Sequence, residues 1–163
     1  MPEGGSSDPM NDPMKMKDVI ISIKGMQNYG DGDDAVEFVT DGQYGYADGC
    51  GKLIYMESEL TGLEGTKTSL SFDPTRMVIE REGTLNSKMI FEQGKRHMFL
   101  YETPYGAATM AVDTRRVRAN LGEHGGDMEI DYVVNFDHSA VGRNTFRIQV
   151  REQGQERRET GHG

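Results

Sequence analysis

The sequence predicts an all-β protein, a single antiparallel meander barrel of about 8–10 strands. Apolar and polar residues alternate with a period of two through most of the chain, which is typical of strands with one buried and one solvated face. Turn-forming residues recur roughly every 8–12 residues, as they do between the strands of all-β proteins. Such consecutive hairpins can form a barrel or a sandwich, and we favour the barrel because its closure removes both exposed sheet edges.

The alternation holds strand by strand. Residues 128–136 place apolar side chains at every even position, with Glu129 and Asp131 on the opposite face. Residues 114–126 are the best helix candidate because they end in glycine, but they also alternate as a strand through Val117. In chain order, the predicted strands are 19–23, 35–40, 53–60, 68–72, 76–82, 88–92, 97–102, 108–112, 116–121, 128–136 and 145–150.

The two ends of the chain differ in composition from the middle. Residues 1–16 hold three of the five prolines together with glycines, serines and acids, so they bury too little apolar area to offset their ordering entropy. Residues 153–163 are polar and end in glycine. We therefore expect a disordered N-terminal extension over 1–16, a barrel domain over 17–152 and a disordered tail over 153–163. Met14 and Met16 precede the first apolar segment, so natural translation could start there.

Charge and cysteine usage exclude several classes of partner. Lys plus Arg is 18 and Asp plus Glu is 27, which gives a net charge of −9. An acidic protein repels phosphate backbones, so neither a nucleic acid nor an anionic membrane is an expected partner. Cys50 is the one cysteine, so an internal disulfide is impossible, and no apolar run approaches the ~18 residues of a membrane span. With no signal peptide at the start, we expect a cytoplasmic protein.

Motifs for metal binding or nucleophilic catalysis are missing from the sequence. The four histidines are scattered without an HExxH pattern, and Cys50 lies in a turn with no histidine near it in sequence. We therefore predict no metal, no cofactor and no catalytic residue, and we regard a non-enzymatic protein as the better hypothesis while the question of an activity stays open.

Arg81 is the most informative side chain, because it continues the apolar face of Met77 and Ile79 and should therefore point inward. An unpaired inward arginine costs several kcal/mol, so it needs a carboxylate or a ligand anion. Glu57 and Glu59 share one face of an earlier strand. An Arg81–Glu57 or Arg81–Glu59 pair within the protein is the interpretation we favour, and an anchor for the acidic head of a ligand is the alternative.

Two further sets of residues belong to the predicted interior. Tyrosine combines an apolar ring with a hydroxyl group, so Tyr101 suits the rim of a cavity as well as ordinary packing. Methionines at alternating strand positions are expected to fill the core; they are Met56, Met77, Met89, Met98, Met110 and Met128.

Four segments carry a family resemblance: ESELTG (57–62), EREG (80–83), YETPYG (101–106) and the closing GRNTFRIQV (142–150). With the sequence between them, they resemble the YwiB-like family of uncharacterised bacterial proteins, from about Lys17 to Glu152 and in the same order and spacing. The resemblance implies a calycin-like or lipocalin-like barrel and brings no settled activity. Barrels of that type often hold one small apolar ligand, although a fold does not fix a function.

Three functional hypotheses follow. The first is a non-enzymatic barrel that binds a small, partly apolar or anionic molecule, with Arg81 as the anion anchor, Glu57 as its partner and Tyr101 at the rim. The second is a solid barrel that acts through a protein partner or as a homodimer. The third, with the least support, is an enzyme that uses Glu57 and Glu59 as a carboxylate pair.

Overall fold

The computed structural model describes residues 15–28, 33–136 and 139–153. Within these ranges the chain forms ten strands in one antiparallel sheet, which confirms the predicted class. In chain order the strands are β2 (Lys17–Asn28), β3 (Asp33–Ala47), β4 (Cys50–Met56), β5 (Lys67–Phe72), β6 (Arg76–Glu82), β7 (Ser87–Glu92), β8 (Arg96–Thr103), β9 (Gly106–Gly122), β10 (Gly125–Phe136) and β11 (Ser139–Glu152).

The sheet closes almost completely into a barrel. The strand order is β7-β6-β5-β4-β3-β2-β11-β10-β9-β8, so β2 and β11, the first and last of the described strands, are neighbours in the middle of the sheet. Between the two end strands, the described residues form one isolated bridge, in which the N–H groups of Asn86 and Glu102 donate to each other's carbonyl oxygens at 2.9 and 3.0 Å. The result is a nearly closed ten-stranded barrel.

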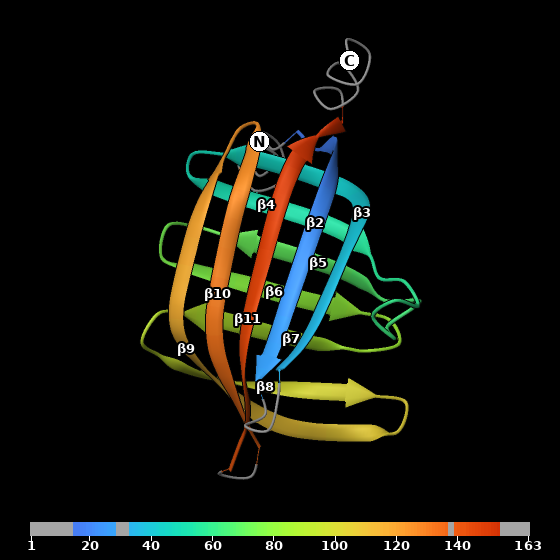
Figure 1. Cartoon of the computed structure of the whole chain (residues 1–163), viewed down its shortest axis with the longest axis vertical. Helices are drawn as coiled ribbons and strands as arrows, with labels where there is room; N and C mark the ends of the chain where they lie inside the picture. The colour runs from blue at the N-terminus through green and yellow to red at the C-terminus, as the bar shows by residue number, and fades with distance from the viewer. Residues whose placement is uncertain (1–14, 29–32, 137–138, 154–163) are drawn as a thin grey trace, which may run out of the picture.

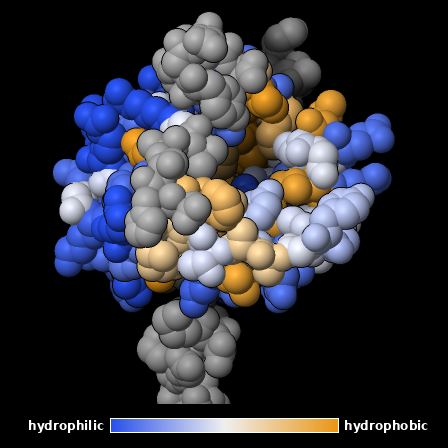
Figure 2. Space-filling model, turned by 90° about the horizontal axis from the view of Figure 1, so that it is seen from below, coloured by the Kyte–Doolittle hydropathy of each residue, from blue (hydrophilic) through white to orange (hydrophobic). Residues whose placement is uncertain are grey.

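Long and short strands form two walls that cross each other (Figure 1). The long strands β2, β10 and β11 run across the shorter strands β4 to β8, and β3 and β9 belong to both walls. β3 pairs first with β2 and then, from Gln43 on, with β4; β9 pairs first with β8 and then with β10. Seen from below, one end of the barrel is hollowed, and hydrophobic groups gather around the hollow (Figure 2).

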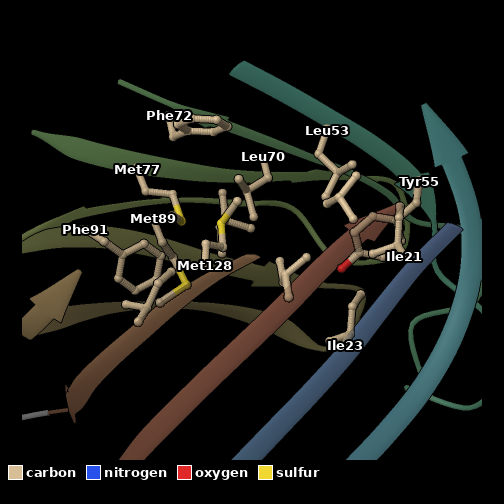
Figure 3. Close-up of a cluster of buried hydrophobic side chains, with 14 of the residues drawn as sticks. Ile21, Ile23, Leu53, Tyr55, Leu70, Phe72, Met77, Met89, Phe91 and Met128 are labelled. Carbon is tan, nitrogen blue, oxygen red and sulfur yellow. The ribbon is translucent and has the colours of Figure 1, made fainter. Parts of the chain in front are cut away.

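Apolar side chains fill the space between the walls (Figure 3). Two cross-strand rows run over β4 to β7, one of Leu53, Leu70, Ile79 and Met89 and one of Gly51, Phe72, Met77 and Phe91. Only glycine fits at position 51, because the ring of Phe72 occupies the space of a side chain there. A Cβ atom at this position would lie 2.2 Å from the ring. From the other wall, Ile21, Met128 and Ile130 complete this core.

Burial confirms most of the predicted inward faces. The helix alternative for residues 114–126 is wrong, because Gly106–Gly122 is one continuous strand with Val117 packed against the core. Two methionines are also corrected: the side chains of Met56 and Met98 are 57% and 64% exposed, because each lies on the outer face of its strand.

Several strand boundaries also differ from the prediction. The predicted strand 53–60 ends at Met56, and the residues after it form turns. The predictions of disorder over 1–16 and 153–163 fall almost entirely outside the described residues. Among the residues that the structure describes, no helix has the length and hydropathy needed to cross a membrane.

Candidate functional site at the open end of the barrel

A row of polar side chains crosses the inner face of the short-strand wall next to the apolar rows. Tyr55 on β4 lies opposite Thr68 on β5, and Thr68 lies opposite Arg81 on β6. Arg81 in turn lies opposite Ser87 on β7. Period-two geometry brings these four side chains to the same face, because each lies two residues from a core residue of its own strand. The interior therefore changes from apolar to polar at this end.

Glu57, directly after β4, is fixed in this site by burial and by hydrogen bonds. Its side chain is 2% exposed. One carboxylate oxygen accepts a hydrogen bond from the Thr68 hydroxyl at 2.5 Å. The other lies 3.0 Å from the Thr61 hydroxyl, whose single proton is shared between this oxygen and the Ser58 carbonyl oxygen at 3.1 Å. Its backbone N–H donates to the carbonyl oxygen of Thr66 at 2.8 Å, which closes the connection between β4 and β5. These bonds hold the carboxylate in one position.

Arg81 lies beside this carboxylate but is not hydrogen-bonded to it. Its Nε is 3.7 Å from Oε2 of Glu57, which is an ion-pair distance beyond the ~2.7–3.2 Å of an N–H···O hydrogen bond. Nε is buried and has no hydrogen-bond partner among the described residues, and the Oγ of Ser87 is in the same state. The side chain of Arg81 is 19% exposed, so part of the guanidinium reaches the open end of the barrel.

A cavity of about 270 Å³ opens at this end and contains the pair. Glu57 and Arg81 are its charged lining residues. The wall is otherwise largely apolar, and Met26, Val36 and Leu60 remain 40%, 50% and 70% exposed at its mouth. The lining also includes Ile23, Gly25, Gln27, Phe38, Tyr55, Thr61, Leu63, Tyr132, Asn144, Thr145 and Phe146.

The two tyrosines of the lining stay neutral. Burial raises the pKa of the Tyr55 phenol above its ordinary value, and the neighbouring Glu57 charge raises it further. Burial also raises the pKa of Tyr132, against a smaller opposing effect of Arg81. Both phenols therefore stay protonated, and the Tyr55 hydroxyl is already hydrogen-bonded with Glu57 and Thr68.

The structure brings together some of the predicted residues and separates others. The expected Arg81–Glu57 pair is present, whereas Glu59 is exposed in the turn after β4 and does not line the cavity. Tyr101 on β8 is half-buried and packs against the core, outside the cavity lining. Within the described ranges, no group of three or more histidine, cysteine, aspartate or glutamate side chains is placed to hold a metal ion.

Sequence reasoning missed Thr61, Thr68, Ser87 and Tyr132. A signal existed for three of them, since Thr68, Ser87 and Tyr132 occupy the inward positions of segments that alternate clearly. No sequence pattern indicated Thr61, because it lies in a turn and its position beside Glu57 depends on the conformation of that turn.

Comparison with known proteins identifies the family. Residues 21–148 match the family described as Domain of unknown function (DUF1934). A crystal structure of the ywiB protein from Bacillus subtilis is similar, with a TM-score of 0.78 and 19% sequence identity over 88% of this chain and 97% of that chain. That likeness supports the barrel fold. A search of curated proteins gives no match.

The family match covers more than half of the chain and agrees with the resemblance drawn from the motifs. The chain belongs to the DUF1934 family of domains of unknown function, and it has the barrel fold of the ywiB protein.

Proposed function

We propose that the cavity at the open end of the barrel binds a small molecule with an apolar body and an acidic head, and that Arg81 anchors the head. The observation that carries the proposal is the guanidinium of Arg81, which faces an apolar-walled cavity with a buried Nε that no described residue satisfies. A guanidinium that makes no hydrogen bond to the described residues would be stabilised by an acceptor atom of a ligand, which would meet the exposed part of the group because Nε itself is buried.

The neighbouring Glu57 does not occupy the hydrogen-bond donors of Arg81, so Arg81 is available to bind the acidic head of a ligand. Its two carboxylate oxygens are engaged by threonine hydroxyls, and its distance to Nε is too long for a hydrogen bond. Arg81 therefore keeps its directional N–H donors available. A guanidinium binds carboxylate and related planar anions through paired N–H groups, which gives orientation as well as attraction.

The size and lining of the cavity suit the rest of such a molecule. Small-molecule sites usually occupy about 300–1,000 Å³ and are mostly apolar with a few polar groups. At about 270 Å³ this cavity lies just below that range, which suits a small ligand. The exposed apolar side chains at its mouth would cover a short alkyl or aromatic body that extends outward.

Calorimetric titration with octanoate tests the proposal, with octanol as the neutral homologue. We expect octanoate to bind to the wild-type protein and Arg81→Met to weaken binding at least about tenfold, because a charge-assisted hydrogen bond contributes roughly 1.5–3 kcal/mol. Arg76→Met is the matched control. Arg76 lies on the same strand but is exposed and outside this cavity.

Octanoate binding by the two variants decides whether the proposal holds. Binding that is lost in Arg81→Met and kept in Arg76→Met supports the proposal. Equal binding to both variants, or no binding of octanoate and of the larger apolar anion anilinonaphthalene sulfonate to the wild type, would contradict it. Native mass spectrometry of freshly purified protein complements this test, since a non-covalent adduct would reveal the mass of a co-purified ligand.

A second candidate function is self-association through β8. This strand ends the sheet order, and its outer face carries Met98 and Leu100, which are 64% and 49% exposed. An edge strand with exposed apolar side chains can pair with another sheet, and a second copy of the chain would supply one. Light scattering after size exclusion tests this: a dimer that Met98→Glu dissociates supports it, and a monomer at all concentrations contradicts it.

A further inference from the structure

We infer that Glu57 restricts the cavity to ligands whose head carries a single negative charge, such as monocarboxylates, and that it rejects dianions such as phosphate monoesters. The inference rests on the proposed function and deepens it, because it assigns a specificity role to a residue that sequence analysis treated as the partner of Arg81.

The described part of the cavity lining holds one positive and one negative side chain. Among the sixteen described residues of the lining, one is cationic and one is anionic, Arg81 and Glu57. The other titratable groups of the lining are the phenols of Tyr55 and Tyr132, which burial keeps neutral. The described residues of the wall therefore have a net charge of zero, and one bound monoanion brings the site to −1.

The carboxylate of Glu57 has a fixed position. Its side chain is 2% exposed, and a hydroxyl group binds each of its oxygens from a different element, Thr61 from the turn and Thr68 from β5. The carboxylate therefore stays beside Arg81 when an anion arrives. A mobile, exposed acid could turn toward solvent instead.

A monoanion and a dianion interact differently with this pair of charges. A monoanion gains the attraction of Arg81 and meets the repulsion of Glu57 at a greater distance, because its oxygens bond to the guanidinium. A second charge on the same head is attracted by Arg81 and repelled by Glu57, so the two wall charges largely cancel for it and the cost of its dehydration is not offset. At an effective dielectric constant of about 20, the repulsion by a carboxylate roughly 6 Å away cancels more than a factor of ten of the affinity that Arg81 alone would give this second charge.

Octyl phosphate tests the inference in the wild-type protein, because the second pKa of a phosphate monoester is about 6. The ligand is largely a monoanion at pH 5 and a dianion at pH 8, whereas octyl sulfate carries one charge at both values. We expect the affinity for octyl phosphate to fall at least about tenfold between pH 5 and pH 8 relative to octyl sulfate. Salt at 0.15 M, with a Debye length of about 8 Å, limits the influence of distant charges.

Two variants test whether the fall in affinity for octyl phosphate depends on Glu57. Glu57→Gln should remove most of the fall for octyl phosphate, since it removes the fixed charge and keeps the size of the side chain. Glu59→Gln is the matched control, because it changes the net charge by the same amount two residues away, in an exposed turn outside the cavity. It should leave the fall unchanged.

Failure of this inference differs from failure of the proposed function. If octyl sulfate binds in an Arg81-dependent way and octyl phosphate binds equally well at both pH values, the charge limit is wrong and the binding function stands. The same conclusion follows if Glu57→Gln and Glu59→Gln behave alike. If neither octyl ligand nor octanoate binds to the wild type, the proposed function itself fails.

Discussion

The Arg81–Glu57 pair should show a measurable coupling in a double-mutant cycle. At 3.7 Å and an effective dielectric constant of about 20, two unit charges attract each other by roughly 4–5 kcal/mol before desolvation is counted. Desolvation of the two groups offsets much of this attraction. The pair also lacks a direct hydrogen bond, and the arginine side chain is 19% exposed. We therefore expect a net coupling of about 1–2 kcal/mol.

The perturbations are Arg81→Met, Glu57→Gln and the two together. Arg81→Met leaves a buried carboxylate with its threonine donors and should lower the free energy of unfolding by about 2 kcal/mol. Glu57→Gln leaves a cation that reaches the open end and should cost about 1 kcal/mol. The double variant should lose about 1–2 kcal/mol less than the sum of the two single losses.

Urea unfolding at pH 7 measures these values, provided that the slope of the transition stays the same in all variants. Arg76→Met combined with Glu57→Gln is the control, because Arg76 is exposed on the same strand, and these two changes should be additive. A coupling below about 0.3 kcal/mol for the Arg81–Glu57 cycle would refute the view that the pair is an electrostatic unit.

Three further predictions concern stability. Tyr44→Phe should lower the free energy of unfolding in urea by about 1 kcal/mol, because the buried Tyr44 hydroxyl donates to the Gly122 carbonyl oxygen at 2.6 Å; no loss would contradict that bond. Ser87→Ala should be neutral or stabilising by the same assay, since its buried Oγ has no partner, and a loss above about 1 kcal/mol would point to a partner. Hydrogen bonding to Arg96 lowers the pKa of Asp113, so its contribution to stability is present above its unfolded pKa of about 3.9 and is lost as pH falls through the lower folded value. Asp113→Asn should therefore flatten the acid limb of urea stability plotted against pH, and an unchanged limb would contradict the assignment.

The fold was largely predictable from sequence because strand periodicity is a local property. Alternation correctly places Met77, Ile79 and Arg81 on one inner face, and Ile130 and Ile148 on another. The closure of the barrel was not predictable in this way, because the pairing of β2 with β11 and the bridge between Asn86, just before β7, and Glu102 on β8 depend on contacts far apart in sequence. Period-two patterning carries no information about which strands become neighbours.

The site was predictable in part. The inward direction of Arg81 and its need for a carboxylate led to Glu57, but the choice between Glu57 and Glu59 required the end point of β4. Strand boundaries are set by hydrogen bonding and turn geometry, which the alternation of 53–60 does not encode. Tyr101 has the right chemistry for a rim residue, yet its place on β8 puts it outside the cavity lining, because that position follows from how the walls cross.

The most direct test of anion binding at Arg81 is the Nε–H signal of this residue in a nitrogen–proton NMR spectrum, assigned by its absence in Arg81→Lys. On addition of octanoate, the account predicts a saturable shift of this signal, because the guanidinium would gain an acceptor, and no shift for the Nε–H of Arg76. An Arg81 signal that stays in place while signals elsewhere in the protein shift to saturation would contradict the account.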